Sequence, residues 1–286
     1  MKTGYSGNWG QRLAQGAGDR GEPFGWWGHR SSPARPYTIV DLVRNSNLDA
    51  RIAAFFWLVV ERRASVVVTS TLQDAGKTTL LTALLDFLPP EMEPLYLRGW
   101  YERFDFIESK NPRTTYLLCN EISDNLPTYL WGPGVQRLFE TAALGYPLAT
   151  TVHGDGAAAM VELLTAYPLD VPLAHLACID FVVTLGGGSR SAGFLRRLMR
   201  VETIDVTDDA GLRIESIAER DVLLGPLVTR PGQLIGLLTD RFGLPRQEAI
   251  TQLARREQFL EHLVHENAGM DSAESVRDAI RRFAAT

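Results

Sequence analysis

Residues 64–87 read ASVVVTSTLQDAGKTTLLTALLDF, and this segment falls into three parts of different character. Residues 64–69 are a β-branched run of the kind that forms a strand buried on both faces. Residues 80–87 are rich in strong helix formers. The loop between them ends in Gly76-Lys77-Thr78-Thr79. A strand, a loop with Gly-Lys-Thr and a helix, in this order, are the context that a phosphate-binding loop (P-loop) requires.

A P-loop binds phosphates because consecutive backbone N–H groups at a helix N-terminus point at the anion. Lys77 adds a positive charge between the outer phosphates, and the Thr78 hydroxyl is the expected Mg²⁺ ligand. The pattern departs from the usual one at Thr71, which stands where the first glycine is expected. Thr71 must therefore adopt dihedral angles that are open to a β-branched residue. The amides expected to surround the phosphates are those of Asp74, Ala75, Gly76, Lys77, Thr78 and Thr79.

Two polar residues follow other apolar runs. Residues 116–121 read YLLCNE, an apolar strand that ends in Glu121, and residues 148–152 precede His153. Ligands gather at the carboxyl ends of parallel strands, and hydrolysis needs a carboxylate that orients or deprotonates water. We therefore expect Glu121 at the tip of a strand beside the P-loop strand, as the catalytic acid and a second Mg²⁺ ligand. His153 is expected to contact the γ-phosphate.

The remaining chain alternates between strand and helix patterns, which predicts an α/β fold with a mostly parallel sheet. A helix near residue 52 repeats its apolar residues with the spacing of one face, and the glycines at 186–188 predict a hairpin loop. We divide the chain into a loosely ordered arm (1–36), a core (37–218) and a C-terminal helical unit (219–286) whose last helix is capped by Asp271 or Ser272. Trp26 or Trp27 is expected to dock on the core. Further strands are predicted at 95–97, 116–119, 149–152 and 181–185, and helices at 135–144 and 157–165.

Composition limits the function classes. The 286 residues carry a formal net charge of −5, which argues against a large nucleic-acid surface. The N-terminus lacks a secretory signal, and no apolar run approaches the about 20 residues that span a bilayer, so we expect a cytoplasmic protein. Cys119 and Cys178 lie in apolar stretches and are expected as buried thiols. The histidines lack the spacing of metal ligands, so a zinc site is not expected.

Taken together, these segments resemble the type II/type IV secretion ATPase superfamily, most of all its archaeal-type branch. Residues 142–155 (AALGYPLATTVHGD) are similar to the family's histidine box, and residues 167–183 and 196–205 follow in the family's order. The resemblance implies a RecA-like core that uses ATP and Mg²⁺. It also implies a homo-hexamer, or a hetero-oligomer with a related ATPase, on the inner face of the cell membrane beside a platform protein. By this resemblance, residues 76–79 correspond to the Walker A loop, Glu121 to the Walker B acid and His153 to the histidine of the histidine box.

The chain also departs from the family. The family's aspartate box has three acids, and of these only Glu102 remains, which we expect to be catalytic by this resemblance. Residues 120–124 read NEISD, without the arginine that the family has there, and most of the N-terminal domain is missing. Three interpretations stay open: an active motor, a slow or inactive paralogue that binds nucleotide and regulates or pairs with a motor, and an unrelated P-loop ATPase or kinase. Motors of this kind need an arginine from a neighbouring subunit. The sequence does not decide which residue it is among Arg44, Arg51, Arg98 and Arg113.

Overall fold

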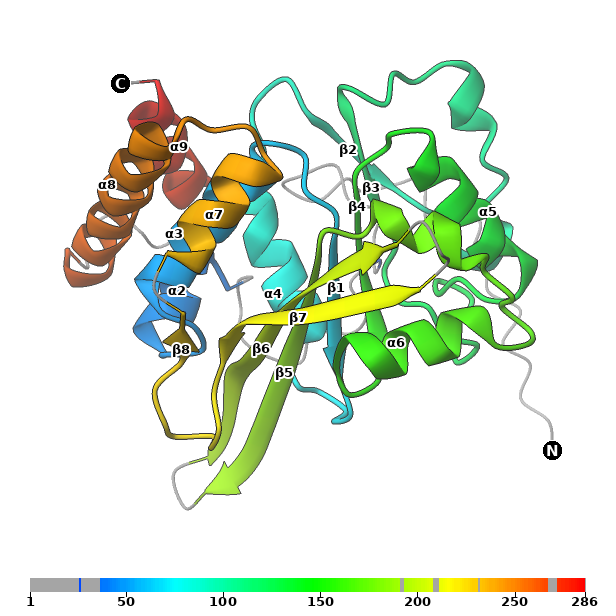
Figure 1. The fold of residues 1–286 in the computed structure, drawn as a ribbon, viewed down its shortest axis with the longest axis horizontal. Helices are drawn as coiled ribbons and strands as arrows, with labels where there is room; N and C mark the ends of the chain where they lie inside the picture. Colours follow the sequence, from blue (N-terminus) through cyan, green and yellow to red (C-terminus); the bar gives the residue numbers. More distant parts are fainter. Residues whose placement is uncertain are drawn as a thin grey trace, which may run out of the picture.

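Five parallel strands and three antiparallel ones make up the eight-stranded sheet of the part of the chain that the structure describes (Figure 1). The structure is a computed structural model, and it describes residue 26 and residues 37–190, 193–207, 211–230, 232–266 and 272–285. The strand order is β2-β3-β4-β1-β5-β6-β7-β8. The first five strands in this order, which include β1, run parallel to one another. The strands are β1 (Val66–Ser70), β2 (Glu93–Tyr96), β3 (Thr115–Leu118), β4 (Leu148–His153), β5 (Phe181–Arg190), β6 (Gly193–Val206), β7 (Leu212–Glu219) and β8 (Val228–Thr229).

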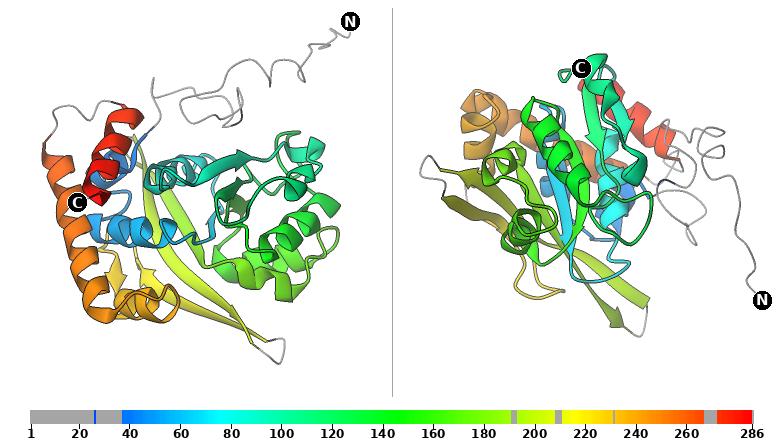
Figure 2. Two further views of the ribbon diagram at one scale, coloured as in Figure 1. Left: turned by 90° about the horizontal axis from the view of Figure 1, so that it is seen from above. Right: turned by 90° about the vertical axis from the view of Figure 1, so that its right-hand side faces the viewer.

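Helices connect the parallel strands and cover both faces of the sheet, so the predicted α/β class with a mostly parallel sheet is confirmed (Figure 2). The α-helices are α2 (Ile39–Arg44), α3 (Ala50–Val60), α4 (Lys77–Leu84), α5 (Pro133–Ala143), α6 (Gly156–Thr165), α7 (Gln233–Asp240), α8 (Arg246–His265) and α9 (Ala273–Ala284). The 3₁₀ turns are η1 (Leu85–Phe87), η2 (Gly99–Tyr101), η3 (Asp105–Glu108) and η4 (Leu173–Cys178).

The alternation of side chains along β1 divides the core into two layers. Val66 and Val68 face the layer that contains α2, α3, α4 and the C-terminal helices. Val67 faces the layer that contains α5, α6 and η4. Strand β1 is the P-loop strand, and it lies between β4 and β5, with Val66 opposite Ala149 on one side and Phe181 on the other. All five residues of β1 are buried, as the β-branched run predicted.

The helix predicted near residue 52 is α3, and its repeating apolar face is buried as expected, but its other sides are buried as well. Every residue of α3 except Arg51 is buried. A helix that is hydrophobic on all sides needs cover on all sides. The outer side of α3 is covered by α8 and α9, which share its hydrophobic cluster with α4. The predicted boundary between residues 218 and 219 stays a prediction, but the helices beyond it share the core of α3.

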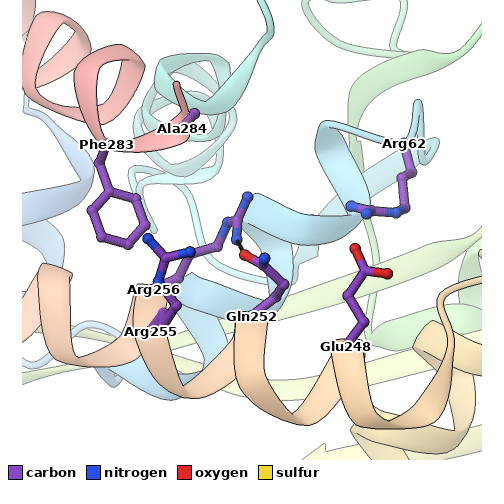
Figure 3. A pocket seen from close by; sticks show the side chains of 7 residues that line it. All are labelled: Arg62, Glu248, Gln252, Arg255, Arg256, Phe283 and Ala284. Atoms are coloured by element: carbon purple, nitrogen blue, oxygen red, sulfur yellow. Dashed lines mark hydrogen bonds between the residues drawn. The ribbon is translucent and has the colours of Figure 1, made fainter. Parts of the chain in front are cut away.

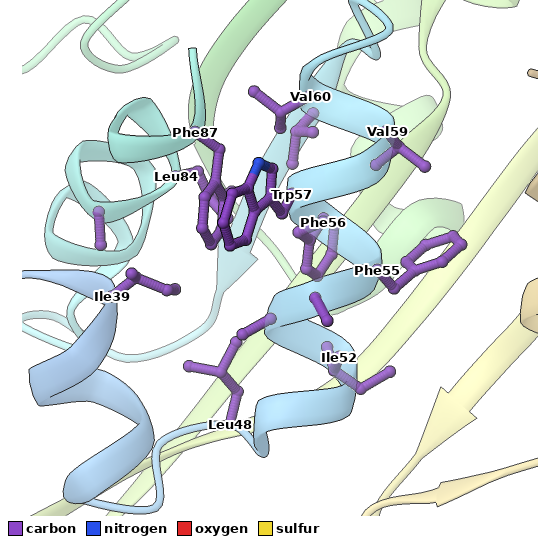
Figure 4. Close-up of a cluster of buried hydrophobic side chains, with 14 of the residues drawn as sticks. Ile39, Leu48, Ile52, Phe55, Phe56, Trp57, Val59, Val60, Leu84 and Phe87 are labelled. Carbon is purple, nitrogen blue, oxygen red and sulfur yellow. The ribbon is translucent and has the colours of Figure 1, made fainter. Parts of the chain in front are cut away.

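Trp57 is the centre of this packing. Its indole stacks on Phe87 with ring centroids 5.3 Å apart and an interplanar angle of 9° (Figure 4). Phe259 of α8 and Phe283 of α9 lie 5.9 Å and 5.5 Å from the same ring. The Arg256 guanidinium lies 5.0 Å over it, which adds a cation–π contact. One side chain thus contacts three elements that are far apart in the sequence.

The hairpin loop predicted at residues 186–188 is wrong, because these glycines lie inside β5 and pair with β6, Gly186 opposite Arg197. A Cβ at Gly186 would lie 2.6 Å from Met199 Cγ, so packing across the hairpin explains a glycine there. Strands β7 and β8 were not predicted. Ile250 of α8 is exposed.

Other predictions agree with the structure. Trp26 is buried, its Nε1–H donates to the Leu97 carbonyl at 2.9 Å, and its ring meets Tyr96 edge-on. Trp27 lies outside the described residues. Ser272 caps α9 with a capping box. Both cysteines are free thiols; Cys119 is buried as predicted, whereas Cys178 is only partly buried, and desolvation raises the pKa of each to about 12. Among the described helices, none combines the length and the apolar character that crossing a bilayer demands.

Replacing Trp57 with alanine should weaken the packing of α3 against the C-terminal helices. We expect the free energy of unfolding to fall by about 3–5 kcal/mol, because the side chain is fully buried and leaves a large cavity. Urea unfolding followed by circular dichroism measures this. Trp100→Ala is the matched control, since Trp100 is 54% exposed and should change stability by less than about 0.5 kcal/mol. Similar losses in the two variants would contradict this description of the core.

Candidate functional site

The P-loop connects β1 to α4 at the carboxyl edge of the sheet. Its two residues with positive φ are Asp74 (55°) and Gly76 (91°), and Thr71 is not among the residues with positive φ. The missing first glycine is thus tolerated, because Thr71 does not need left-handed dihedrals. The Ser70 hydroxyl accepts a hydrogen bond from the Leu72 N–H at 3.1 Å, which tightens the entry to the loop.

The start of α4 suits an anion. Gly76 is the N-cap residue and has no side chain with which to cap the first-turn N–H groups of the helix. These N–H groups have no partners inside the helix, and the helix dipole favours negative charge at this end. Helix α4 begins at Lys77, followed by Thr78 and Thr79 in the first turn. Donors, cation and hydroxyl are therefore present together, as phosphate and Mg²⁺ binding require.

Lys77 and Glu121 face each other in the structure. Lys77 Nζ lies 3.8 Å from Glu121 Oε2, and the two side chains are only 10% and 15% exposed. The Thr151 hydroxyl from β4 lies 3.4 Å from the same carboxylate oxygen and donates to the Asn120 carbonyl at 2.9 Å. The acid is thus held beside the lysine of the P-loop by a neighbouring strand.

The strand that carries Glu121 is not the neighbour of the P-loop strand, and this expectation is wrong. Strand β3 pairs with β2 and β4, and β4 lies between β3 and β1. The chain beyond β3 crosses toward β1, where Ile122 bridges Val152 and its N–H donates to the Thr151 carbonyl at 2.9 Å. This crossing brings the Glu121 carboxylate to Lys77.

His153 and Glu102 occupy different surroundings. His153 ends β4 and is the Cα partner of Ser70, the last residue of the P-loop strand, and its side chain is exposed. Glu102 follows η2, and its carboxylate accepts hydrogen bonds from the backbone N–H groups of Arg98, Arg103 and Phe104 at 2.8–2.9 Å. Glu102 therefore fixes the shape of its own loop, and its catalytic role stays a prediction.

Sequence reasoning missed Tyr129. The segment after Glu121 folds back, with the Leu130 N–H donating to the Glu121 carbonyl at 2.9 Å. Burial raises the pKa of the Tyr129 phenol, and the charges of Glu121 and Asp74 raise it further. Tyr129 thus stands next to Leu130 in the segment that folds back on Glu121. Nothing in the sequence pattern singles it out, since its place depends on the path of the loop.

The two cavities that we describe lie away from the P-loop. One, of about 180 Å³, lies between α8, α9 and the turn after α3 (Figure 3). Arg256 in its wall donates to Gln252 and, at 2.9 Å, to Glu61, so its charge is already compensated within the chain. The other, of about 320 Å³, includes Asp49, Arg220 and His265 in its lining. Neither has a P-loop residue in its lining.

No protein-family model matches the chain. It is similar to an uncharacterised protein of Methanocaldococcus jannaschii, with 24% identity over 255 residues, which covers 78% of this chain and 90% of that protein. A second uncharacterised protein of the same organism is 23% identical over 195 residues, or 59% of this chain and 34% of that protein.

Two solved structures are also similar in part. The VirB11 ATPase from the Brucella suis type IV secretion system, in complex with sulphate, matches with 18% identity and a TM-score of 0.39 over 61% of this chain and 65% of that one. The Legionella pneumophila ATPase DotB matches with 16% identity and a TM-score of 0.34 over 81% and 62%. The match thus spans less than two thirds of either solved chain. The two curated relatives are uncharacterised, so the function of this chain rests on the geometry of its P-loop and of Glu121.

Proposed function

We propose that the chain is a P-loop ATPase subunit of the type II/type IV secretion kind, which binds ATP with Mg²⁺ and hydrolyses it to drive protein translocation or the assembly of a pilus-like fibre. The observation that carries the proposal is the 3.8 Å approach of Lys77 Nζ to Glu121 Oε2 at the carboxyl edge of a parallel sheet. A lysine at the start of the P-loop helix and an acid that faces it are the charged groups that attack of water on a γ-phosphate needs.

Each residue of the site has a role in this proposal. The amides of residues 74–79 hold the phosphates, and Lys77 places its charge at the outer ones. Bound Mg²⁺ would supply charge neutralisation, with the Thr78 hydroxyl and Glu121 as its protein ligands, the latter directly or through water. Glu121 orients water and accepts its proton. His153, exposed at the edge beside Ser70, reports the presence of the γ-phosphate.

The assembly part of the proposal rests on the sequence resemblance. It comprises a homo-hexamer, or a hetero-oligomer with a related ATPase, that works in the cytoplasm against a platform protein of the membrane. Arg44 and Arg51 form ion pairs with Asp41 and Glu257 of the same chain, at 3.5 Å and 3.3 Å. All four arginines are exposed, but among the described residues Arg98 and Arg113 form no ion pair, which leaves them better placed to reach a neighbouring subunit. Light scattering with and without nucleotide tests ring formation, and a monomer under all conditions counts against the motor.

One observation favours a second candidate, a protein that binds nucleotide with little or no turnover. Glu102 is the only acid left of the family's aspartate box, and both of its carboxylate oxygens accept hydrogen bonds from its own loop. Each charged group lost from such a site costs orders of magnitude in rate. Nucleotide binding without steady-state phosphate release would identify this second candidate.

Lys77→Ala tests the binding part of the proposal. We expect the Kd for ATP to rise by at least about tenfold, because the variant loses a charge-assisted contact to phosphate. Isothermal titration calorimetry with Mg²⁺ present measures it. Lys110→Ala is the matched control, since Lys110 binds Glu93 at the surface at 2.7 Å and should leave the Kd unchanged. If the wild-type chain bound neither ATP nor ADP, the proposed function would fall.

Glu121→Gln separates binding from turnover. We expect phosphate release to slow by about 10²-fold or more, because the amide cannot accept a proton from water. We expect ATP still to bind, because the backbone amides and Lys77 that hold the phosphates are unchanged. Asp124→Asn is the control: it removes one negative charge from an exposed position of the same loop and should change neither quantity. Equal turnover in the Glu121→Gln variant and the wild type would exclude Glu121 as the catalytic acid.

A further inference from the structure

One arginine of β6, the strand that pairs with β5, contacts the P-loop. Arg196 lies on β6, opposite Gly187 of β5, and β5 pairs with the P-loop strand β1. Its Nε–H donates to the carbonyl oxygen of Asp74 at 2.7 Å. The two residues are 122 positions apart in the sequence, so this contact exists only in the folded chain. The P-loop pattern does not point to it, and the family resemblance of residues 196–205 does not say what Arg196 contacts.

The direction of this hydrogen bond determines what it does to the loop. A trans peptide is planar, so its C=O and N–H groups point in opposite directions. A donor that holds the Asp74 carbonyl therefore also fixes the Ala75 N–H, which points to the other side of the peptide plane. The P-loop binds anions through N–H groups of this kind. Arg196 thus binds the carbonyl side of the Asp74–Ala75 peptide, while the Ala75 N–H donor points away from Arg196.

The same contact stabilises an unfavourable backbone conformation. Asp74 has a φ of 55°, in the left-handed region that residues with a side chain rarely adopt. The hydrogen bond from the charged Arg196 guanidinium offsets part of the cost of this backbone conformation. It can therefore hold the Asp74 peptide in this orientation before any ligand binds.

The stem of the arginine also contacts the second residue of the loop with positive φ. A Cβ built on Gly76 would lie 3.2 Å from Arg196 Cδ and 3.8 Å from its Nε, so the side chain runs along the bare α-carbon of Gly76. The absence of a side chain at Gly76 thus provides the space that Arg196 uses. One side chain contacts both positions at which the loop turns.

The position of Arg196 is itself held by the turn between α2 and α3. The Asn47 side chain donates to the Arg196 carbonyl at 2.9 Å, and the Leu198 N–H donates to the Asn47 carbonyl at 2.7 Å. The neighbouring Arg197 side chain donates to the Asn45 carbonyl at 3.1 Å and to the Arg196 carbonyl at 2.9 Å. Of the two side chains, Arg196 thus contacts the P-loop, whereas Arg197 contacts the turn and the backbone of β6.

We propose that Arg196 is a positioning residue for the nucleotide: it holds the peptide between Asp74 and Ala75 in the orientation that presents the Ala75 N–H to the phosphates of a nucleoside di- or triphosphate. The inference rests on the proposed function, because the anion it serves is the nucleotide. Since this peptide belongs to the phosphate-binding loop and not to the chemistry of water attack, Arg196 affects the affinity for ATP and ADP alike.

The test compares Arg196→Ala, Arg196→Lys and Arg197→Ala with the wild type by isothermal titration of ATP and ADP. We expect Arg196→Ala to raise both Kd values about five- to tenfold, the effect of one charge-assisted hydrogen bond at a partly exposed position. Arg196→Lys should recover part of the loss, because lysine keeps the charge but not the planar Nε donor. Arg197→Ala, the matched control, should change Kd by less than about twofold.

Two further readouts distinguish positioning from general stabilisation. The Tm of Arg196→Ala without nucleotide should stay near that of the wild type, while the rise in Tm on adding nucleotide becomes smaller. In steady-state assays of a chain that turns over, KM should rise and kcat should change little, because bound nucleotide completes the loop. If Arg196→Ala bound nucleotide as tightly as the wild type, or if Arg197→Ala lost as much affinity, the positioning role of Arg196 would be overturned, but the proposed function would not. A wild-type chain that binds no nucleotide would overturn the proposed function instead.

Discussion

The pairing of β1 with β4 and β5 is the constraint on which the site depends. Because these strands are parallel and in register, their carboxyl ends lie at one edge of the sheet. The P-loop leaves β1 at this edge, and His153 lies opposite Ser70. The bridge between Ile122 and Val152 brings Glu121 to the same edge, although its strand is one place removed. A shift of β4 by one residue would reverse the faces of its side chains and separate Thr151 from Glu121.

The parts of the fold that could be predicted are those that depend on local sequence. The β-branched run, the Gly-Lys-Thr loop and the helix formers are consecutive in the chain, so 64–87 indicated β1, the P-loop and α4 correctly. Glu121 was predicted from the end of an apolar strand, which is also a local signal. The order of the strands is not local, and for this reason β3 was expected beside β1 when β4 lies there.

The missed residues of the site have the same physical explanation. Arg196 contacts Asp74 across a hairpin that the glycines at 186–188 obscured, since glycines in a strand resemble a turn when their packing partner Met199 is unknown. Tyr129 and Thr151 are ordinary loop and strand residues in the sequence. Their roles come from the return of the loop after Glu121 and from the neighbour of β3.

Helix α3 shows how one buried helix connects parts of the chain that the sequence separates. Its periodicity revealed the face on the sheet, while its second face is covered by α8 and α9, about 200 residues later. Trp57, Phe87, Phe259 and Phe283 share the volume at this junction. A core tolerates changes of size best when the total volume is kept. Relatives of this chain should therefore exchange bulk among these four positions, so that a smaller residue at one is accompanied by a larger one at another.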